Sequence, residues 1–416
     1  MLVIYLISLF IAPQLWIEPF VGMRVDFIIY PLWLLVLIAS SKTDKLLEFN
    51  VQDKVFLGMI FWIIVTSIVN PENSLTDKVI FNYIKWFVLY KFVAVTLANE
   101  NGLSSVIKKS IFIVYIIVFE AIQHKLSADG IGWAGQALGW VDQSVLDAGG
   151  TGRTRWINIF DGPGVFCVMF TFILPFLLQY LDKHYTFKTK FTALVLMGPL
   201  LFAIWTTGSR GGFLATLAVI GSYVLTRMNI SFFTMLKIGG LLLAIYVAAP
   251  SHLTSIKDDN NSAQHRVDMW MEGIEMVQQN PVFGIGKGNF VGYTGVLIAH
   301  NSAIEVMGEI GLPGFFLWIS LIYLSFKNIR LYIEAEDNPV NLSYAKGVSL
   351  TLIGYLVSSF FITLEYETIY FILAITRSMV YHKGIELEYD RKDFYIVTGV
   401  MFVFYVVLKV FVRLYY

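Results

Sequence analysis

Apolar segments long enough to cross a lipid bilayer recur along almost the whole chain. A transmembrane helix needs about 20 consecutive, mostly apolar residues. Hydrophobic residues make up 57% of the 416 residues and charged residues only 14%, against about 25% charged residues in an average soluble domain. A water-soluble core has no use for so much apolar surface. The sequence therefore predicts an all-α, polytopic transmembrane helical bundle that forms a single integral membrane domain over residues 1–416.

We expect about 12 spans, or about 13 if every apolar segment crosses the bilayer. The expected spans are 2–18, 25–40, 54–70, 79–98, 106–122, 157–181, 191–207, 211–227, 232–250, 309–327, 343–363, 366–381 and 394–413. The first segment lacks a basic start and a small-residue cleavage site, so we interpret it as a span and not as a cleavable signal peptide.

The distribution of basic residues predicts which loops face the cytoplasm. Short cytoplasmic loops of membrane proteins are enriched in Lys and Arg. If the N-terminus is cytoplasmic, the inner segments hold more of these residues than the outer ones. This orientation places two long loops, about 123–156 and 251–299, on the extracytoplasmic side. Because loops on a rigid scaffold often carry function, we expect these two to form the active-site region.

The second long loop contains a predicted amphipathic helix. Apolar side chains recur at helical spacing between residues 264 and 279, and Asn280-Pro281 should end the helix. Arg266 would then begin the helix, where its guanidinium and the free N–H groups both attract anions; a solvated surface Arg is the alternative. The following GIGKGNF follows no strand, so we interpret it as a flexible hinge or close-contact loop and not as a nucleotide-binding loop.

Two further residues on the same expected side of the membrane are candidates for chemistry. Arg210 lies in the tight turn TTGSRGGF between two expected spans. Charged residues at such depth are costly and usually functional. His300 lies at the mouth of the next span, and His is the side chain most readily used as a base near neutral pH. Glu305 and Glu309 share a helix face below it, where they would orient the His, bind polar substrate or cap the span.

The first long loop ends in Arg153 and Arg155, followed by the sequence DGPG from Asp161 to Gly164. A Pro with two Gly at that depth predicts an interrupted helix that lines a cavity. We expect His124, His252 and His265 to be solvated. No third ligand is spaced to join Asp258 and Asp259, so we predict no metal site there.

Composition excludes two classes of function. Lys plus Arg and Asp plus Glu both number 30, so there is no net charge to favour binding of nucleic acid. The single Cys167 excludes an internal disulfide and a cysteine metal cage.

Several short motifs together resemble the O-antigen ligase and polymerase superfamily of membrane glycosyltransferases. They are Ser209-Arg210, the segment from Arg266 through NPVFGIGKGNF, Ala299-His300-Asn301, and the run from Glu309 to Gly314. The resemblance implies a donor glycan linked to undecaprenyl pyrophosphate, used at the outer face of the bacterial cytoplasmic (inner) membrane. It also implies transfer with inversion at the anomeric carbon, without a metal or a cofactor.

The resemblance also implies roles for residues and for partners. Arg210 and Arg266 match the arginines that hold the pyrophosphate, and His300 matches the essential histidine. We expect further substrate contacts from Arg153, Arg155, Asn301, Glu305 and Glu309. The expected partners are the lipid-linked oligosaccharide, a glycan or lipid A-core acceptor, the bilayer and a chain-length regulator protein.

Polymerase and ligase share this chemistry and differ in the acceptor. The ten-residue spacing between Arg153 and Gly164 is typical of polymerases and favours that assignment, with ligation to the lipid A-core as the alternative. A small-anion transporter or a non-catalytic assembly scaffold are further alternatives. A transporter requires charged residues along a path near mid-bilayer, where Lys85 and Asp161 are the candidates.

Overall fold

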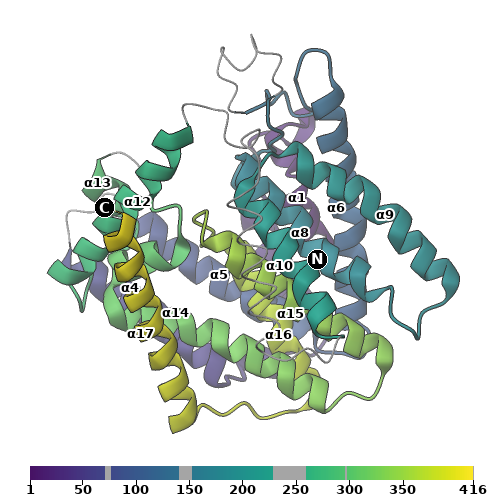
Figure 1. Ribbon diagram of the computed structural model, residues 1–416. Helices are drawn as coiled ribbons and strands as arrows, with labels where there is room; N and C mark the ends of the chain where they lie inside the picture. The colour runs from purple at the N-terminus through teal and green to yellow at the C-terminus, as the bar shows by residue number, and fades with distance from the viewer. Residues whose placement is uncertain (71–75, 140–151, 228–258, 296–297, 416) are drawn as a thin grey trace.

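The computed structural model describes residues 1–70, 76–139, 152–227, 259–295 and 298–415. Within these ranges every regular element is a helix, apart from two isolated β-bridges. The helices are α1 (Leu2–Phe10), α2 (Val25–Ala39), α3 (Thr43–Leu47), α4 (Val51–Val69), α5 (Thr76–Leu97), α6 (Gly102–Leu126), α8 (Pro163–Gln179), α9 (Phe187–Thr206), α10 (Arg210–Leu225), α12 (Asp259–Gln279), α13 (Phe290–Thr294), α14 (Ser302–Glu334), α15 (Pro339–Ser359), α16 (Glu367–Lys383) and α17 (Arg391–Tyr415). Short 3-10 turns occupy Pro13–Leu15, Glu18–Phe20 and Asn158–Phe160. The predicted all-α class is confirmed (Figure 1).

Five of the described helices are long and apolar enough to cross a membrane: α4, α5, α9, α14 and α17. Each coincides with an expected span. The apolar helices α2, α8 and α10 are shorter, with 15, 17 and 16 residues. The expected span 232–250 lies outside the described residues. The chain is a multi-pass membrane protein.

The structure corrects two expected helix boundaries. The first helix ends at Phe10 and not near residue 18, because Ala12 takes a left-handed conformation (φ +52°) directly before Pro13. The expected helix break at Asp161–Gly164 is wrong, because this sequence is a helix start. Gly162 (φ +148°) precedes Pro163, the first residue of α8, and proline is well suited to that position because its missing N–H is not needed there.

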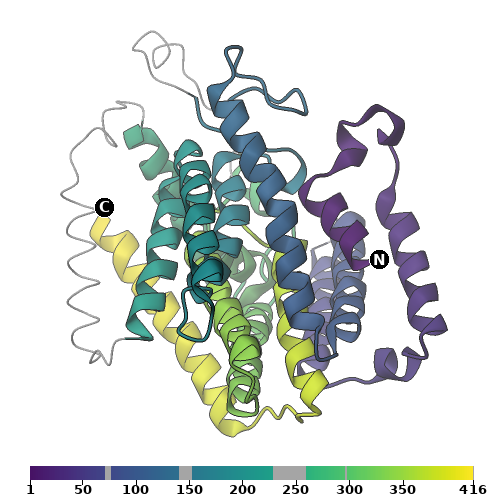
Figure 2. The same ribbon diagram turned by 90° about the vertical axis from the view of Figure 1, so that its right-hand side faces the viewer.

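Helix α14 is the central element of the bundle. It packs against α4, α12, α15, α16 and α17, while α8, α10 and α15 form a second group of packed helices. In Figure 2 most helices of the bundle run roughly side by side, and α17 passes diagonally across its outside.

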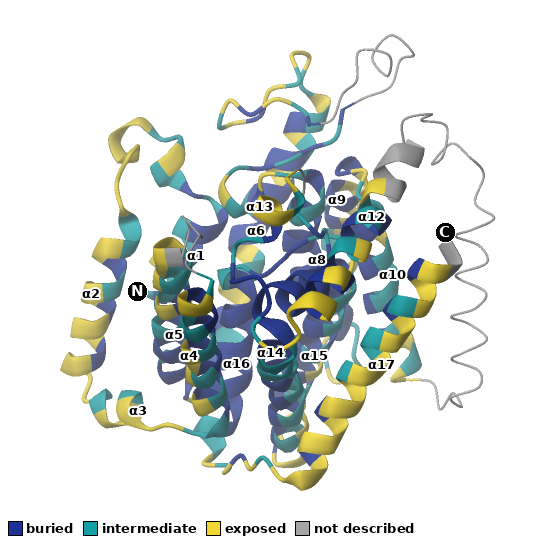
Figure 3. Ribbon diagram, turned by 90° about the vertical axis from the view of Figure 1, so that its left-hand side faces the viewer, coloured by how far each residue is buried: buried dark blue, intermediate teal, exposed yellow. Residues whose placement is uncertain are grey.

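Burial follows this arrangement (Figure 3). The side chains of α14, α15 and α16 are mostly buried, whereas α2 and α17 expose large apolar residues such as Leu35 (60% exposed) and Phe402 (68% exposed). In a membrane protein such surfaces face lipid, which is as apolar as the side chains themselves.

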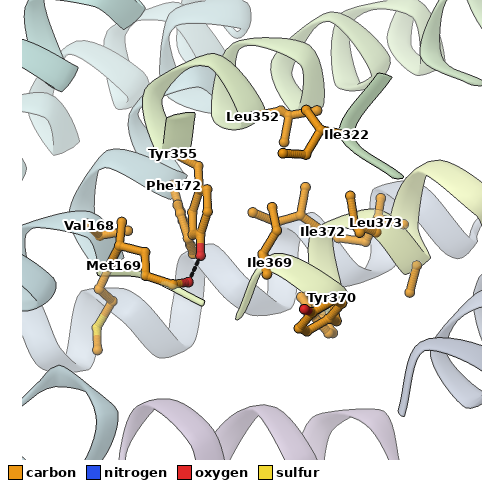
Figure 4. Close-up of a cluster of buried hydrophobic side chains, with 14 of the residues drawn as sticks. Val168, Met169, Phe172, Ile322, Leu352, Tyr355, Ile369, Tyr370, Ile372 and Leu373 are labelled. Atoms are coloured by element: carbon orange, nitrogen blue, oxygen red, sulfur yellow. Dashed lines mark hydrogen bonds between the residues drawn. The ribbon is translucent and has the colours of Figure 1, made fainter. Parts of the chain in front are cut away.

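A core of apolar side chains joins the two groups of helices (Figure 4). Phe172 on α8 lies near Tyr355 on α15, with ring centroids 5.8 Å apart. Ile322 on α14 and Ile372 on α16 are buried in the same hydrophobic cluster. Close packing of this kind resists deformation, so α14, α15 and α16 give a rigid base to the loops at their ends.

Candidate active site

The turn that holds Arg210 is short and fixed. Helix α9 ends at Thr206 and α10 begins at Arg210 itself. Gly208 supplies the left-handed conformation (φ +57°) that the turn requires. The Ser209 side chain caps α10 by accepting a hydrogen bond from the Gly212 N–H at 3.1 Å. The half-buried Arg210 therefore stands at the positive end of a helix, where its guanidinium and the backbone N–H groups both favour an anion.

Arg153 lies against this turn. A Cβ atom on Gly208 would come within 3.2 Å of the Arg153 side chain, so a larger residue at 208 would displace Arg153. The backbone of Thr154 is tied to the end of α9, where its N–H donates to the Thr206 carbonyl at 3.1 Å. Arg153 and Arg210 thus meet at one turn although they lie far apart in the sequence.

Arg155 has a different environment. Its Nη1 atom lies 3.1 Å from Asp161 Oδ1, and its Nε donates to the Ala137 carbonyl at 2.9 Å. The Arg155 and Asp161 side chains are 33% and 57% exposed. Arg155 therefore links Ala137 to Asp161 at an exposed position.

Arg266 does not begin its helix, contrary to the sequence-based expectation. Helix α12 begins at Asp259, so Arg266 lies about two turns inside it. The free N–H groups at the start of the helix are therefore not next to Arg266. The predicted helix and its end at Asn280-Pro281 are confirmed, since α12 ends at Gln279. The helix begins several residues before the expected start at residue 264.

The His300 corner packs on α12. The Trp270 Nε1–H donates to the Ala299 carbonyl at 3.1 Å, which holds this segment against the helix. His300 itself has φ +49°, a left-handed conformation that costs about 1–3 kcal/mol for a residue other than Gly. The turn allows Asn301 to cap α14, because its Oδ1 accepts from the N–H groups of Ala303 and Ile304 at 3.0 and 3.2 Å. Strain of this kind is typical of functional sites.

The electrostatics of His300 suit a general base. Its side chain is half-buried. Burial, and then the charge of the nearby Arg266, lower the pKa of His300 below its ordinary value of 6.5. The imidazole is therefore neutral near pH 7 and able to accept a proton.

The loop Phe360–Tyr366, between α15 and α16, connects the Arg210 turn with the His300 corner. On one side, the Leu364 N–H donates to Ser302 Oγ at 2.8 Å and the Asn301 Nδ2 donates to the Phe360 carbonyl at 3.4 Å. On the other side, a Cβ atom on Gly211 would come within 2.6 Å of Phe361. The two halves of the site thus share one backing loop.

Sequence reasoning did not identify this loop. Two expected spans, 343–363 and 366–381, left no room for it. The polar residues Thr363 and Glu365 between those apolar segments were the available signal.

The contacts of the GIGKGNF segment favour the close-contact alternative over a flexible hinge. Lys287 is only 6% exposed. Its Nζ lies 2.5 Å from Glu309 Oε2 on α14 and 2.8 Å from Glu365 Oε2 in the backing loop. Burial alone would lower the pKa of Lys287, but the two carboxylates outweigh it and raise the pKa above the ordinary value. The lysine is therefore charged.

Backbone contacts hold the same segment against α14, next to the kink that Gly311 (φ +67°) makes in this helix. The Ile285 and Gly286 N–H groups donate to the Gly308 and Glu309 carbonyls at 3.2 and 2.8 Å. Gly284 (φ +63°) approaches so closely that a Cβ atom would lie 2.4 Å from the Glu309 carbonyl oxygen. The alternative of a close-contact loop is the one that the structure supports.

Glu305 and Glu309 are both buried on α14, and their described contacts go elsewhere than to His300. Glu305 Oε2 accepts from Thr363 Oγ1 at 2.6 Å. Glu309 accepts from Lys287 and, through Oε1, from the Phe290 N–H at 3.0 Å. Both carboxylates thus attach neighbouring loops to the start of α14.

The remaining expectations concerned three histidines and one metal site. His124 is fully buried, not solvated, and its Nδ1 lies 3.8 Å from Glu120, which also accepts from Gln136 at 2.6 Å. His265 is exposed as expected, while His252 and Asp258 lie outside the described residues. Within the described ranges, no three His, Cys, Asp or Glu side chains gather where they could hold a metal ion.

An apolar groove of about 690 Å³ opens beside the His300 corner. Its lining includes Val400, Val403 and Val407 on α17, together with Trp270, Asn301 and Phe360 from other elements. The groove thus runs from a lipid-facing helix to a residue adjacent to His300.

Residues 192–319 match a family model described as O-antigen ligase. No curated protein matches the sequence. The matched segment contains Arg210, Arg266 and His300, and it ends inside α14. The resemblance inferred from the motifs is confirmed.

Proposed function

The chain carries an O-antigen ligase family segment, and from this premise we propose that it is a glycosyltransferase that uses a glycan linked to undecaprenyl pyrophosphate. The observation that carries the proposal is the shared backing loop. Phe360–Tyr366 contacts the Arg210 turn on one side and the His300 corner on the other. A pyrophosphate held by arginines and a base for the acceptor would then lie in one site.

The proposed reaction needs a base, a nucleophile and a stabilised leaving group. The acceptor hydroxyl oxygen attacks the anomeric carbon, the bond from that carbon to the pyrophosphate oxygen breaks, and His300 takes the hydroxyl proton. Attack opposite the leaving group inverts the anomeric configuration. The leaving polyprenyl pyrophosphate gains negative charge, which Arg210 and Arg266 neutralise with charge-assisted hydrogen bonds. No metal or cofactor is needed for this scheme.

The other candidate residues supply secondary contacts in this proposal. Arg153, beside Gly208, adds a third positive charge near the pyrophosphate. Arg155 on the exposed rim contacts the sugars of the incoming glycan. Asn301 offers its Nδ2 group to the donor, and Glu305 and Glu309 act through the loops that they hold.

The apolar groove is the proposed place for the polyprenyl chain. It joins the lipid-facing α17 to the corner at Asn301, so a lipid could enter from the bilayer while its head group reaches the arginines. The site then faces the extracytoplasmic side of the cytoplasmic membrane, as the distribution of Lys and Arg favours.

We assign the transfer to polymerisation of repeat units, with a chain-length regulator as a further partner. The two ends of the Arg153–Gly164 spacing support this choice, because both lie near the turn at Ser209. Arg153 packs against Gly208, and a Cβ atom on Gly164 would lie 3.7 Å from Ser209 Oγ. Ligation to the lipid A-core remains the alternative outcome.

Among the described residues, no specific contact supports a small-anion transporter or a non-catalytic scaffold. Lys85 lies 3.6 Å from Asp26, and Asp161 pairs with Arg155 at an exposed rim. The two candidate charges for a transport path are thus each paired locally. A scaffold role would predict that alanine at Arg210, Arg266 and His300 leaves activity intact.

The test of the proposal is what accumulates when the site is inactivated. Arg210→Ala, Arg266→Ala and His300→Ala should each abolish polymer formation in cells while the protein still inserts in the membrane. Single lipid-linked repeat units with one-unit caps would indicate a polymerase, and uncapped core with full-length lipid-linked polymer would indicate a ligase. Normal polymer yield in all three variants would rule out this site.

A further inference from the structure

The buried ion cluster of Lys287, Glu309 and Glu365 contacts α14 and the backing loop, and it takes no part in the proposed chemistry. Lys287, Glu309 and Glu365 are exposed by 6%, 1% and 7%. Charges at such burial are costly unless they are paired. A flexible polar loop would not need them, so their presence in a loop of glycines points to a specific task.

The cluster connects α14 to the backing loop Phe360–Tyr366. Glu309 lies on α14, about two turns from the Asn301 cap, and Lys287 contacts it at 2.5 Å. Glu365 lies in the backing loop, and Lys287 contacts it at 2.8 Å. The same Glu365 accepts hydrogen bonds from the Tyr83 hydroxyl on α5 and from the Tyr370 hydroxyl on α16. One ammonium group therefore fixes α14 and the backing loop relative to one another.

The GIGKGNF loop is itself held from a further side. Trp62 on α4 stacks on Phe283, with centroids 5.5 Å apart, and its Nε1–H donates to the Ile310 carbonyl at 2.9 Å. The Asn70 Nδ2 reaches the Gly284 carbonyl at 3.5 Å. These contacts hold the loop in place, so that Lys287 lies within reach of its two carboxylates.

We propose that Lys287 is a positioning residue for glycan transfer, which holds the His300 corner and the Phe360–Tyr366 loop at the separation that the reaction requires. The inference rests on the proposed function. Lys287 acts through Glu309 and Glu365 and does not touch the substrate. Its loss should slow the transfer step more than it weakens donor binding, because the arginines are attached to α10 and α12.

The test compares two lysines of equal burial in the purified, full-length protein in proteoliposomes. Lys287→Met is the variant. Lys91→Met is the matched control, since Lys91 is also 6% exposed and lies 3.2 Å from Asp53, on α5 and α4. With a lipid-linked oligosaccharide as donor, we expect Lys287→Met to lower kcat by more than about tenfold and to change KM by less than about threefold. Lys91→Met should lower the thermal transition by a similar amount and leave kcat within about twofold.

A triple variant separates positioning from stability. Lys287→Met with Glu309→Gln and Glu365→Gln leaves no charge on the three residues of the cluster, so much of the loss in the thermal transition should be recovered while kcat stays low. Recovery of kcat together with the thermal transition would overturn the proposal, as would a kcat for Lys287→Met within about twofold of wild type. If His300→Ala keeps full activity in the same assay, the proposed function fails instead, and this inference fails with it.

Discussion

At the scale of single residues, the site depends on groups whose backbone and charge are set by their neighbours. His300 has a left-handed backbone and a depressed pKa, and Asn301 beside it uses its side chain to cap α14. The sequence motif identified both residues, but only the structure shows that Asn301 is already engaged by the helix. This suggests that part of the Ala299-His300-Asn301 motif serves the fold.

The pH dependence of transfer should report the state of His300. Since burial and Arg266 lower its pKa below 6.5, kcat/KM should be constant near neutrality and fall on acidification, with an apparent pKa below 6.5. Arg266→Gln removes the positive charge that lowers the pKa of His300. The pKa of His300 should therefore rise, and the acid limb of the variant's residual activity should move to higher pH. Arg266→Lys keeps the charge and should leave the limb in place, although its rate falls because a bidentate contact is lost. If the acid limb stays at the same pH in Arg266→Gln as in Arg266→Lys, the result would contradict His300 as the base.

Substitutions at Asn301 should separate capping from substrate binding. Asn301→Ala removes the cap and should cost about 1 kcal/mol of stability. Asn301→Asp keeps a capping oxygen and should restore most of that stability, but it removes the Nδ2 donor. We expect Asn301→Asp to be stable and to have a raised KM for the donor lipid. Wild-type kinetics for Asn301→Asp would show that Asn301 serves only the helix.

At the scale of elements, the close approach of GIGKGNF to α14 is the feature most sensitive to a single methyl group. Gly284→Ala places a Cβ atom 2.4 Å from a backbone oxygen at φ +63°. The conformation costs about 1–2 kcal/mol, and the overlap should add about 1–3 kcal/mol.

The control is Gly384→Ala, where φ is +64° and a Cβ atom would have no other atom within 4 Å. This variant should lose only the stability that the left-handed conformation costs. Thermal or denaturant unfolding in detergent measures both variants. Equal losses of stability would contradict the close packing of this loop on α14.

Apolar patterning predicted most helices of this chain but few of its contacts. The helix from 264 to 279 and the tight turn at Arg210 were predicted because periodicity and glycines are local signals. The partners of Lys287 were not, because Glu309 and Glu365 lie on other elements and ion pairing leaves no periodic trace. The start of α8 at Pro163 was misread for a related reason: the same Pro and Gly residues can begin a helix or interrupt one.

At the scale of the whole molecule, an apolar groove connects the lipid-facing surface to the proposed site. Val403 lines this groove, whereas its neighbour Phe402 does not. Val403→Trp should obstruct a long polyprenyl chain and lower kcat/KM for a donor of full chain length by about tenfold. For a donor with a short prenyl chain, Val403→Trp and wild type should have the same kcat/KM.

The control Phe402→Trp enlarges a side chain that is already 68% exposed, so it should leave both donors unaffected. The same loss with short and long donors in Val403→Trp would show that the groove does not hold the lipid tail. The comparison needs only initial rates with the two donors in detergent.

The most direct test of the account is transfer by the purified protein, reconstituted with a labelled lipid-linked oligosaccharide and an acceptor glycan. We predict a longer glycan product together with free polyprenyl pyrophosphate, and the loss of both products in Arg210→Ala and His300→Ala at unchanged protein folding. Equal turnover by wild type and by these two variants would contradict a site built from the Arg210 turn and the His300 corner.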